Sequence, residues 1–291
     1  MAKRTREKKR RDKNIILFLV EGDCEVFALQ NPLTALYDLA HPDYRIIFAQ
    51  QYCLCREEQS SQDYSEDQIE EELDNSDDGY ISEAVYKPGG DITSGFYVTP
   101  ENIETKIFNR FFKPLMEKER ILPGMLLQVI QIVDLDGVYL NDSQIGPYSP
   151  IRVGKEKVYY NSGESKIECR NPEAIQERNK HKRENIDFLS QLQSIKMGSK
   201  TIPYSVYYFS SNLDHFLHND ANLEKGKTSM AKSFSAFYSS NLPGFIDVFF
   251  NDSASANGQT YASSWEAVKK GSKSITRGSN LNLLIEEILN T

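Results

Sequence analysis

Residues 14–25 read NIILFLVEGDCE, so six consecutive apolar residues are followed at once by Glu21, Gly22 and Asp23. An apolar run of this length without polar alternation indicates a strand that is buried on both faces, as in a parallel sheet. Residues 23–40 then carry apolar side chains at helical spacing, and we expect Pro32 to bend or divide that helix. Residues 44–50, YRIIFAQ, predict a second short strand. The order strand, helix, strand predicts an α/β fold.

The size and composition of the chain indicate a soluble globular protein. Its 291 residues can form one large domain or two modest ones, with a substantial core. The longest apolar run is far shorter than the roughly 20 residues that span a bilayer, so no membrane contact is expected. That run is also too short for a signal-peptide core and is followed by charge. The four cysteines show neither a zinc spacing nor the density of a disulfide scaffold, which favours a reducing, cytoplasmic setting.

The net charge of -8 is unevenly distributed along the chain. Residues 1–13 hold eight bases and two acids, whereas residues 57–78 hold eleven acids and no base. The basic arm has two equally supported interpretations, contact with nucleic-acid phosphates or a solubilising tail. The acidic run could imitate nucleic acid or dock a basic partner, but a solvated loop is the favoured interpretation.

The apolar pattern divides the rest of the chain into segments. It disappears between residue 53 and about residue 95, which predicts an acidic insertion. It returns in a helix expected to begin near Thr99, and then in residues 124–137, GMLLQVIQIVDLDG, a second apolar run that ends in acids. A charged helix is expected over residues 173–195 and a strand over 201–210, with loops over 146–168. We therefore predict an α/β domain over 14–220, whose parallel sheet is flanked by helices, and a mainly helical C-terminal extension over 221–291.

Three acids stand where the predicted strands end. Glu21 closes the first strand, and Asp134 and Asp136 close the third, so they converge if these strands are neighbours, because ligands bind at the carboxyl ends of parallel strands. Taken singly, each acid is more often a solvated strand end or turn. Taken together, they would repel strongly without a divalent cation or protons, and hard oxygen ligands suit Mg²⁺ or Mn²⁺. The joint pattern favours a metal site formed by Glu21, Asp134 and Asp136.

The segments FLVEGDCEVFAL and IVDLDG together resemble the Toprim domain, in which one strand ends in Glu-Gly and a later strand ends in Asp-x-Asp. This domain occurs in topoisomerases, bacterial primases and the nucleases of the overcoming-lysogenization-defect and RloB-like groups. The basic segment before the first strand is similar to that of the RloB-like phage-defence proteins. The segment YYFSSNLDHFLHND loosely resembles their strand-to-helix segment with another acid, which would correspond to Asp214. The resemblance covers about half of the chain.

The resemblance implies a Mg²⁺- or Mn²⁺-dependent nuclease that cleaves DNA or RNA, including tRNA, and that acts in antiviral (anti-phage) defence by abortive infection. Asp134 and Asp136 would bind the metal, Glu21 would hold metal or act as general acid or base, and Asp214 would be a fourth acid. A partner ATPase could control the enzyme, and a homodimer would suit cleavage of two strands. The alternative is a catalytically silent Toprim-like module that acts by binding a protein partner.

Other polar clusters give weaker signals. The spacing of His215 and His218 beside Asp214 would suit metal ligands, but a zinc site needs further ligands that the sequence does not offer. Lys225 and Lys227 lie in EKGKTS, which lacks the full phosphate-loop spacing and is expected to be a surface loop. Acids close to the three strand-end acids are expected to lie in solvated turns; these are Asp23, Glu25 and Asp142.

Overall fold

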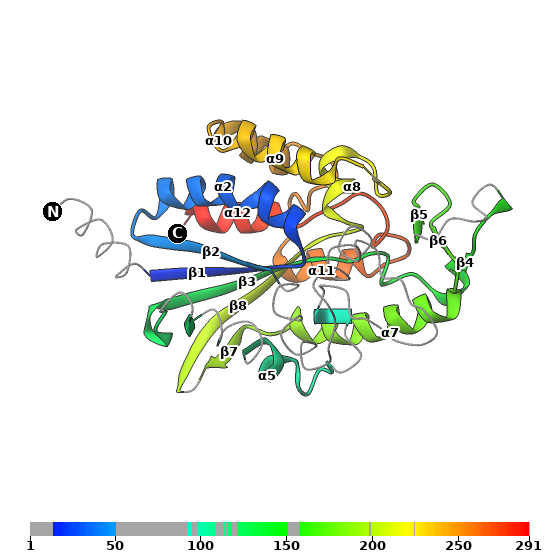
Figure 1. Cartoon of the computed structure of the whole chain (residues 1–291), viewed down its shortest axis with the longest axis horizontal. Coiled ribbons are helices and arrows are strands. Elements are labelled where there is room, and N and C mark those ends of the chain that lie inside the picture. The colour runs from blue at the N-terminus through cyan, green and yellow to red at the C-terminus, as the bar shows by residue number, and fades with distance from the viewer. Residues whose placement is uncertain are drawn as a thin grey trace, which may run out of the picture.

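A five-stranded mixed sheet forms the centre of the molecule (Figure 1). The computed structural model describes residues 14–50, 92–94, 98–108, 113, 116–117, 121–150, 158–197, 199–223 and 225–290. The basic arm and most of the acidic insertion therefore lie outside the described residues. The strand order is β2-β1-β3-β8-β7. The strands are β1 (Asn14–Val20), β2 (Tyr44–Gln50), β3 (Leu126–Asp134), β7 (Ser194–Met197) and β8 (Lys200–Phe209).

The apolar run that opens the chain forms β1, and both of its faces are buried. Ile15, Leu17 and Leu19 belong to the core on one side of the sheet. Ile16, Phe18 and Val20 belong to the core on the other side. β1 pairs in parallel with β2 and with β3, and β3 pairs in parallel with β8. The predicted α/β core with a mostly parallel sheet is therefore confirmed in its coarse form, and β7 pairs antiparallel with β8.

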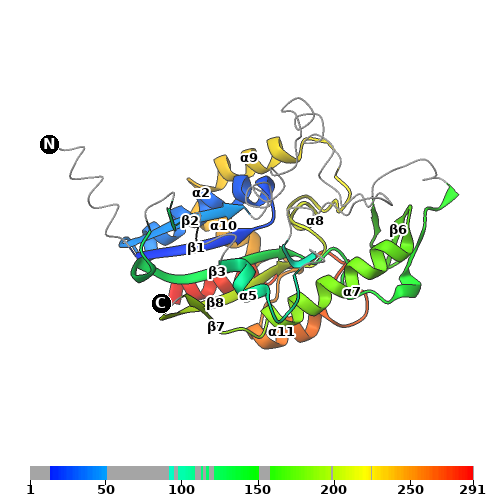
Figure 2. The same cartoon turned by 60° about the horizontal axis from the view of Figure 1, so that its bottom comes forward.

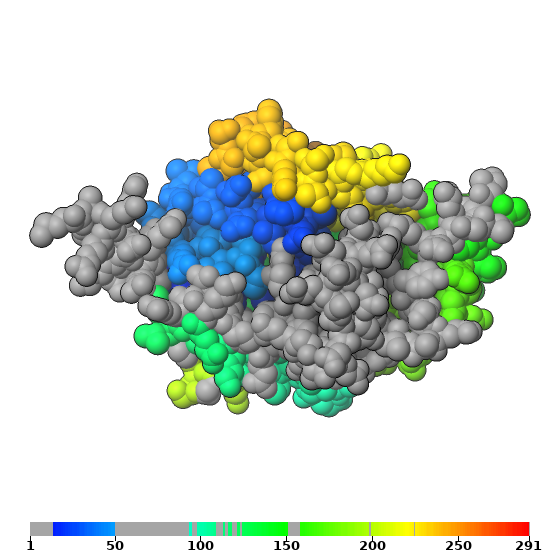
Figure 3. Space-filling model, viewed as in Figure 1, coloured from blue at the N-terminus to red at the C-terminus, as the bar shows by residue number. Residues whose placement is uncertain are grey.

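Helices cover both faces of the sheet (Figures 1 and 2). On one face lie α2 (Asp23–Ala40), α8 (Leu213–His218) and α12 (Leu281–Asn290), and α9 (Lys227–Tyr238) and α10 (Leu242–Phe250) pack on the outer side of these helices. The other is covered by α5 (Ile103–Ile107), α7 (Pro172–Leu189) and α11 (Tyr261–Val268). Figure 3 shows α9 and α10, in yellow and orange, lying over the blue α2. The C-terminal segment is mainly helical, and α12 packs on one face of the sheet and α11 on the other.

Several local details differ from the expectations. Helix α2 continues through Pro32, whose ring is buried in the core, and this packing offsets the lost backbone hydrogen bond. The helix expected from Thr99 begins at Ile103, after the N-cap Asn102. The expected loops over 146–168 include most of a small sheet of β4 (Ile145–Pro147), β6 (Lys166–Cys169) and β5 (Tyr159–Asn161).

In the described part of the chain, no helix is long and apolar enough to cross a membrane.

Candidate active site at the carboxyl ends of the central strands

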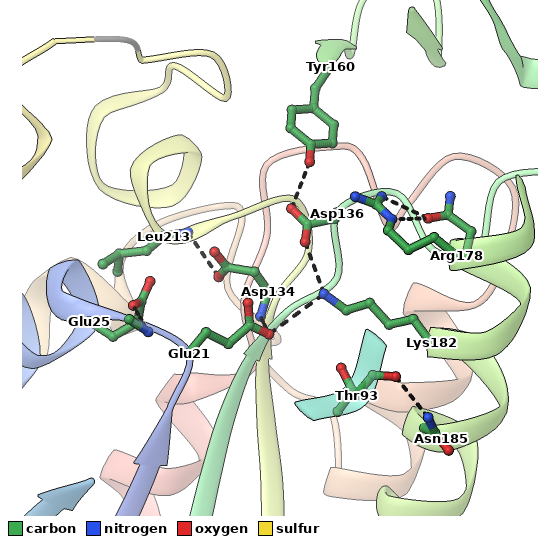
Figure 4. A network of polar contacts seen from close by, with 12 residues as sticks. Glu21, Glu25, Thr93, Asp134, Asp136, Tyr160, Arg178, Lys182, Asn185 and Leu213 are labelled. Carbon is green, nitrogen blue, oxygen red and sulfur yellow. Dashed lines mark hydrogen bonds and ion pairs between the residues drawn. The ribbon is translucent and has the colours of Figure 1, made fainter. Parts of the chain in front are cut away.

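Glu21 and Asp134 meet where β1 and β3 end side by side (Figure 4). Glu21 follows the last residue of β1, and Asp134 is the last residue of β3. The Oε1 atom of Glu21 accepts a hydrogen bond from the backbone amide of Asp134 at 3.0 Å. The structure thus brings together two of the three acids that the sequence placed at this edge.

Asp136 is turned away from the strand direction by a bend in the backbone. Its φ is +50° and that of Gly137 is +72°, so both residues adopt left-handed conformations. The bend is held by backbone hydrogen bonds from Asp136 to Ser211 and from Gly137 to Ser274, both 2.9 Å. A side chain at position 137 would have to adopt this positive φ and would lie 2.9 Å from Ile167 Cδ1, so Ile167 would have to shift to accommodate it. The bend directs the Asp136 carboxylate toward α7 (Figure 4).

The Asp136 carboxylate is held by two donors from distant parts of the chain. Its Oδ2 lies 3.0 Å from Lys182 Nζ of α7, and its Oδ1 accepts a hydrogen bond from the Tyr160 hydroxyl of β5 at 3.0 Å. The Lys182 ammonium also lies 3.7 Å from Glu21 Oε1, and its side chain is only 2% exposed. Lys182 therefore links two of the predicted site acids, although the sequence analysis did not identify it.

The buried polar face of α7 also holds the loop that follows β3. The Arg183 guanidinium donates to the carbonyls of Val138 and Leu140 at 2.8–3.1 Å. Asn179 donates to the carbonyl of Gly137 at 3.5 Å. These bonds satisfy carbonyls that a sharp turn would otherwise leave without partners, and they fix the loop on which Asp136 stands.

Asp214 lies next to the acids, but its carboxylate points to another partner. The backbone amide of its neighbour Leu213 donates to Asp134 Oδ1 at 3.2 Å, which places the start of α8 against Asp134. The Asp214 carboxylate pairs with Lys227 Nζ of α9 at 3.4 Å. The predicted fourth acid is therefore adjacent to the site through the backbone and is joined to a lysine at the start of α9.

Glu25 is the acid whose environment the sequence predicted wrongly. It was expected in a solvated turn, but it is only 7% exposed, and its Oε2 accepts a hydrogen bond from the amide of Gly22 at 2.9 Å. This contact caps the first turn of α2 and fixes the Glu25 charge near Asp134 (Figure 4). Asp23 and Asp142 are exposed, as expected.

The pKa values of the two aspartates are pushed in opposite directions. Burial raises the pKa of Asp134 well above its usual range, and the charges of Glu25, Glu21 and Asp136 raise it further. Burial would also raise the pKa of Asp136, but Lys182, Arg178 and the hydrogen bonds from Lys182 and Tyr160 outweigh it and lower that pKa. Neighbouring carboxyl groups with divergent pKa values are typical of sites that bind cations or transfer protons.

The metal site expected at Glu21, Asp134 and Asp136 remains a prediction. Within the described ranges, no group of three or more His, Cys, Asp or Glu side chains is arranged so that it could hold a metal ion. His215 and His218 therefore belong to no such group among the described residues. Lys182 instead lies between Glu21 and Asp136, so an ammonium group stands beside the oxygen donors.

Comparison of the chain with protein-family models, with curated proteins and with solved structures gave no significant match. Function is therefore inferred from the residues and their geometry, together with the motif resemblance described above.

Proposed function

We propose that this chain is a Toprim-like, divalent-cation-dependent nuclease whose site is formed by Glu21, Asp134 and Asp136. The observation that carries the proposal is the contact between Glu21 Oε1 and the Asp134 amide at 3.0 Å. This contact holds two acids at the carboxyl ends of neighbouring parallel strands, which is the edge where ligands bind in α/β sheets. Rigid strands are well suited to aiming catalytic carboxylates.

The residues at this edge fit Mg²⁺ or Mn²⁺ in donor chemistry and in charge. All donors are carboxylate oxygens, and Mg²⁺ is commonly bound by only one or two carboxylates, with water and substrate phosphate completing its shell. Asp134 and Glu21 supply such a pair, and the nearby charges of Glu25 and Asp136 outnumber the single positive charge of Lys182. When bound, the divalent cation neutralises charge that develops on a phosphate and activates water.

The chain's own residues have distinct tasks in this proposal. Asp134 presents a carboxylate whose orientation is fixed by the Leu213 amide. Because its pKa is raised by burial and by neighbouring acids, Asp134 holds a proton more tightly than an ordinary aspartate, and it would have to lose that proton to serve as a metal ligand. Asp136 holds the Lys182 ammonium in place, and the Tyr160 hydroxyl fixes the other oxygen of Asp136.

The wider role is proposed from the motif resemblance. The substrate would be DNA or RNA, including tRNA, and the enzyme would be an effector of antiviral defence in the cytoplasm. A partner ATPase would control it, and two copies would act on two strands.

A catalytically silent Toprim-like module, acting through a protein partner, is the second candidate. It is favoured by one observation, namely that Lys182 occupies the space between Glu21 and Asp136 where a shared metal was expected.

The test is cleavage of DNA and of tRNA by the purified chain with Mg²⁺ or Mn²⁺. Glu21→Gln and Asp134→Asn are expected to lower the rate by more than about 10³-fold, because each removes a group that acts in the transition state. Asp142→Asn, at an exposed acid outside the site, is the matched control and should retain activity. Far-ultraviolet circular dichroism and thermal melting check that each variant is folded.

Two outcomes would contradict the nuclease proposal. Cleavage by folded Glu21→Gln and Asp134→Asn at the wild-type rate would show that the acids have no chemical role. A lack of cleavage by the isolated folded chain, together with stable co-purification of a large ATPase, would favour the binding module.

A further inference from the structure

Lys182 is a buried cation that contacts two acids of the candidate site. Its side chain is 2% exposed, and its ammonium contacts Asp136 Oδ2 at 3.0 Å and Glu21 Oε1 at 3.7 Å (Figure 4). The other oxygen of Asp136 accepts from the Tyr160 hydroxyl. Both oxygens of Asp136 are therefore already engaged by donors from this chain.

The helix that carries Lys182 is anchored by the residue next to Lys182 and by another in the turn that follows. Arg183 donates to the carbonyls of Val138 and Leu140. One turn further along, the buried Asn185 side chain donates to the carbonyls of Thr93 and Val98 at 2.9 and 3.1 Å. Because these bonds fix α7 against the site, the Lys182 ammonium has a defined position among the acids.

Asp134 differs from Asp136 in how its carboxylate is engaged. Its Oδ1 accepts from the Leu213 amide at 3.2 Å. Among the described residues, no side chain forms an ion pair with Asp134, and Lys182 contacts Asp136 and Glu21 instead. Asp134 is therefore an acid of this cluster whose carboxylate no cationic side chain of the described residues contacts.

We propose that Lys182 takes the place of one cation in this cluster, so that the native site binds a single divalent ion, at Asp134 and Glu21. The existence of that ion rests on the proposed function. The acids Glu21, Glu25, Asp134 and Asp136 carry four negative charges when ionised, and Lys182 supplies one positive charge. A second divalent ion at Asp136 would have to displace the ammonium, and an ammonium left in the interior without its partner is strongly unfavourable.

The test counts Mn²⁺ ions bound per chain, by electron paramagnetic resonance of free Mn²⁺ during a titration. The wild-type chain is expected to bind one. Lys182→Met, which keeps the length of the side chain and removes its charge, is expected to bind a second ion or to bind the first at least tenfold more tightly. Lys182→Arg keeps the charge and is expected to bind one. Lys180→Met, on the exposed face of the same helix, is the matched control and should also bind one.

The outcomes separate this inference from the proposed function. Two ions on the wild-type chain, or Lys182→Met with the wild-type count and affinity, would overturn the role of Lys182 and leave the nuclease proposal standing. No Mn²⁺ on the folded wild-type chain would overturn both. If Lys182→Met does not fold, the counts for wild type and Lys182→Arg decide, because two ions on either would refute the single-ion site.

Discussion

The carboxylate of Glu21 accepts a hydrogen bond from the backbone amide of Asp134, although 113 positions separate the two residues in the chain. The end of β3 therefore fixes the side chain of the residue that directly follows β1. A carboxylate held in this way does not need to be ordered again when a ligand arrives, and such preorganisation is a main source of catalytic power.

Replacing Asp134 by Asn should stabilise the metal-free protein at neutral and alkaline pH. Burial, Glu25, Glu21 and Asp136 raise the pKa of Asp134 in the folded chain. The folded state then binds the proton more tightly than the unfolded state, so the free energy of unfolding falls as pH rises from about 3.9 through the raised pKa. Asn keeps the shape and removes the charge. In EDTA at pH 8 we expect a rise of the melting temperature of roughly 2 °C or more, the size of effect that about 1 kcal/mol produces.

The pH dependence distinguishes this cause from a general packing effect. At pH 4 the raised pKa of Asp134 disfavours its ionised form in the folded chain, so the advantage of Asp134→Asn should shrink, while Asp142→Asn should match wild type at both values. A lower melting temperature for Asp134→Asn at pH 8 would contradict the expected repulsion.

Gly137→Ala should destabilise the protein more than Gly258→Ala, although both glycines have nearly the same backbone conformation. Their φ angles are +72° and +70°, so alanine costs about 1 kcal/mol at either position. An added Cβ meets Ile167 at 2.9 Å and Leu140 at 3.3 Å at position 137, and nothing within 4 Å at position 258. The extra crowding should add roughly 1–2 kcal/mol in urea unfolding.

The same pair of variants tests the loop on which Asp136 stands. Gly137→Ala should also reduce nuclease activity because it shifts the neighbouring Asp136, whereas Gly258→Ala should not. Equal losses of stability in the two variants would show that the Ile167 side chain can move aside at no measurable cost in unfolding free energy.

Asp214→Asn should reduce cleavage by about tenfold rather than abolish it, a change of about 1.4 kcal/mol in the activation free energy. The Asp214 carboxylate contacts Lys227 at 3.4 Å, so its main effect should be exerted through that lysine. Lys227→Met should give a similar loss, and the double variant should be no worse than either single one. An inactive Asp214→Asn beside an active Lys227→Met would show instead that Asp214 acts directly on the substrate.

The strand ends were predictable because their signals are local. The apolar run before Glu21 and the run before Asp134 each indicate a buried strand, and parallel strands share one functional edge. Strand β7 was missed because its four residues are too few for a periodic pattern, and β5 was missed for the same reason. Tyr160 was overlooked with β5.

The partners of the acids were less predictable because they depend on distant contacts. Lys182 belongs to a helix rich in charged residues, which is the usual composition of a solvated surface helix. The polar positions 178, 182 and 185 do share one helical face, but only the fold shows that this face meets Asp136 rather than water. Glu25 was misjudged because its burial depends on the packing of α2, not on its neighbours in sequence.

The parallel pairing of β1 with β3 has a consequence for how the protein folds. The two strands are separated by more than 100 residues, so their pairing must close a long loop before any contact between them is gained. Such non-local topology slows folding, and Lys182 is added still later in the chain. During synthesis the acids thus have no shared site until β3 has left the ribosome, and under the proposed function a shorter growing chain would be unable to cleave nucleic acid.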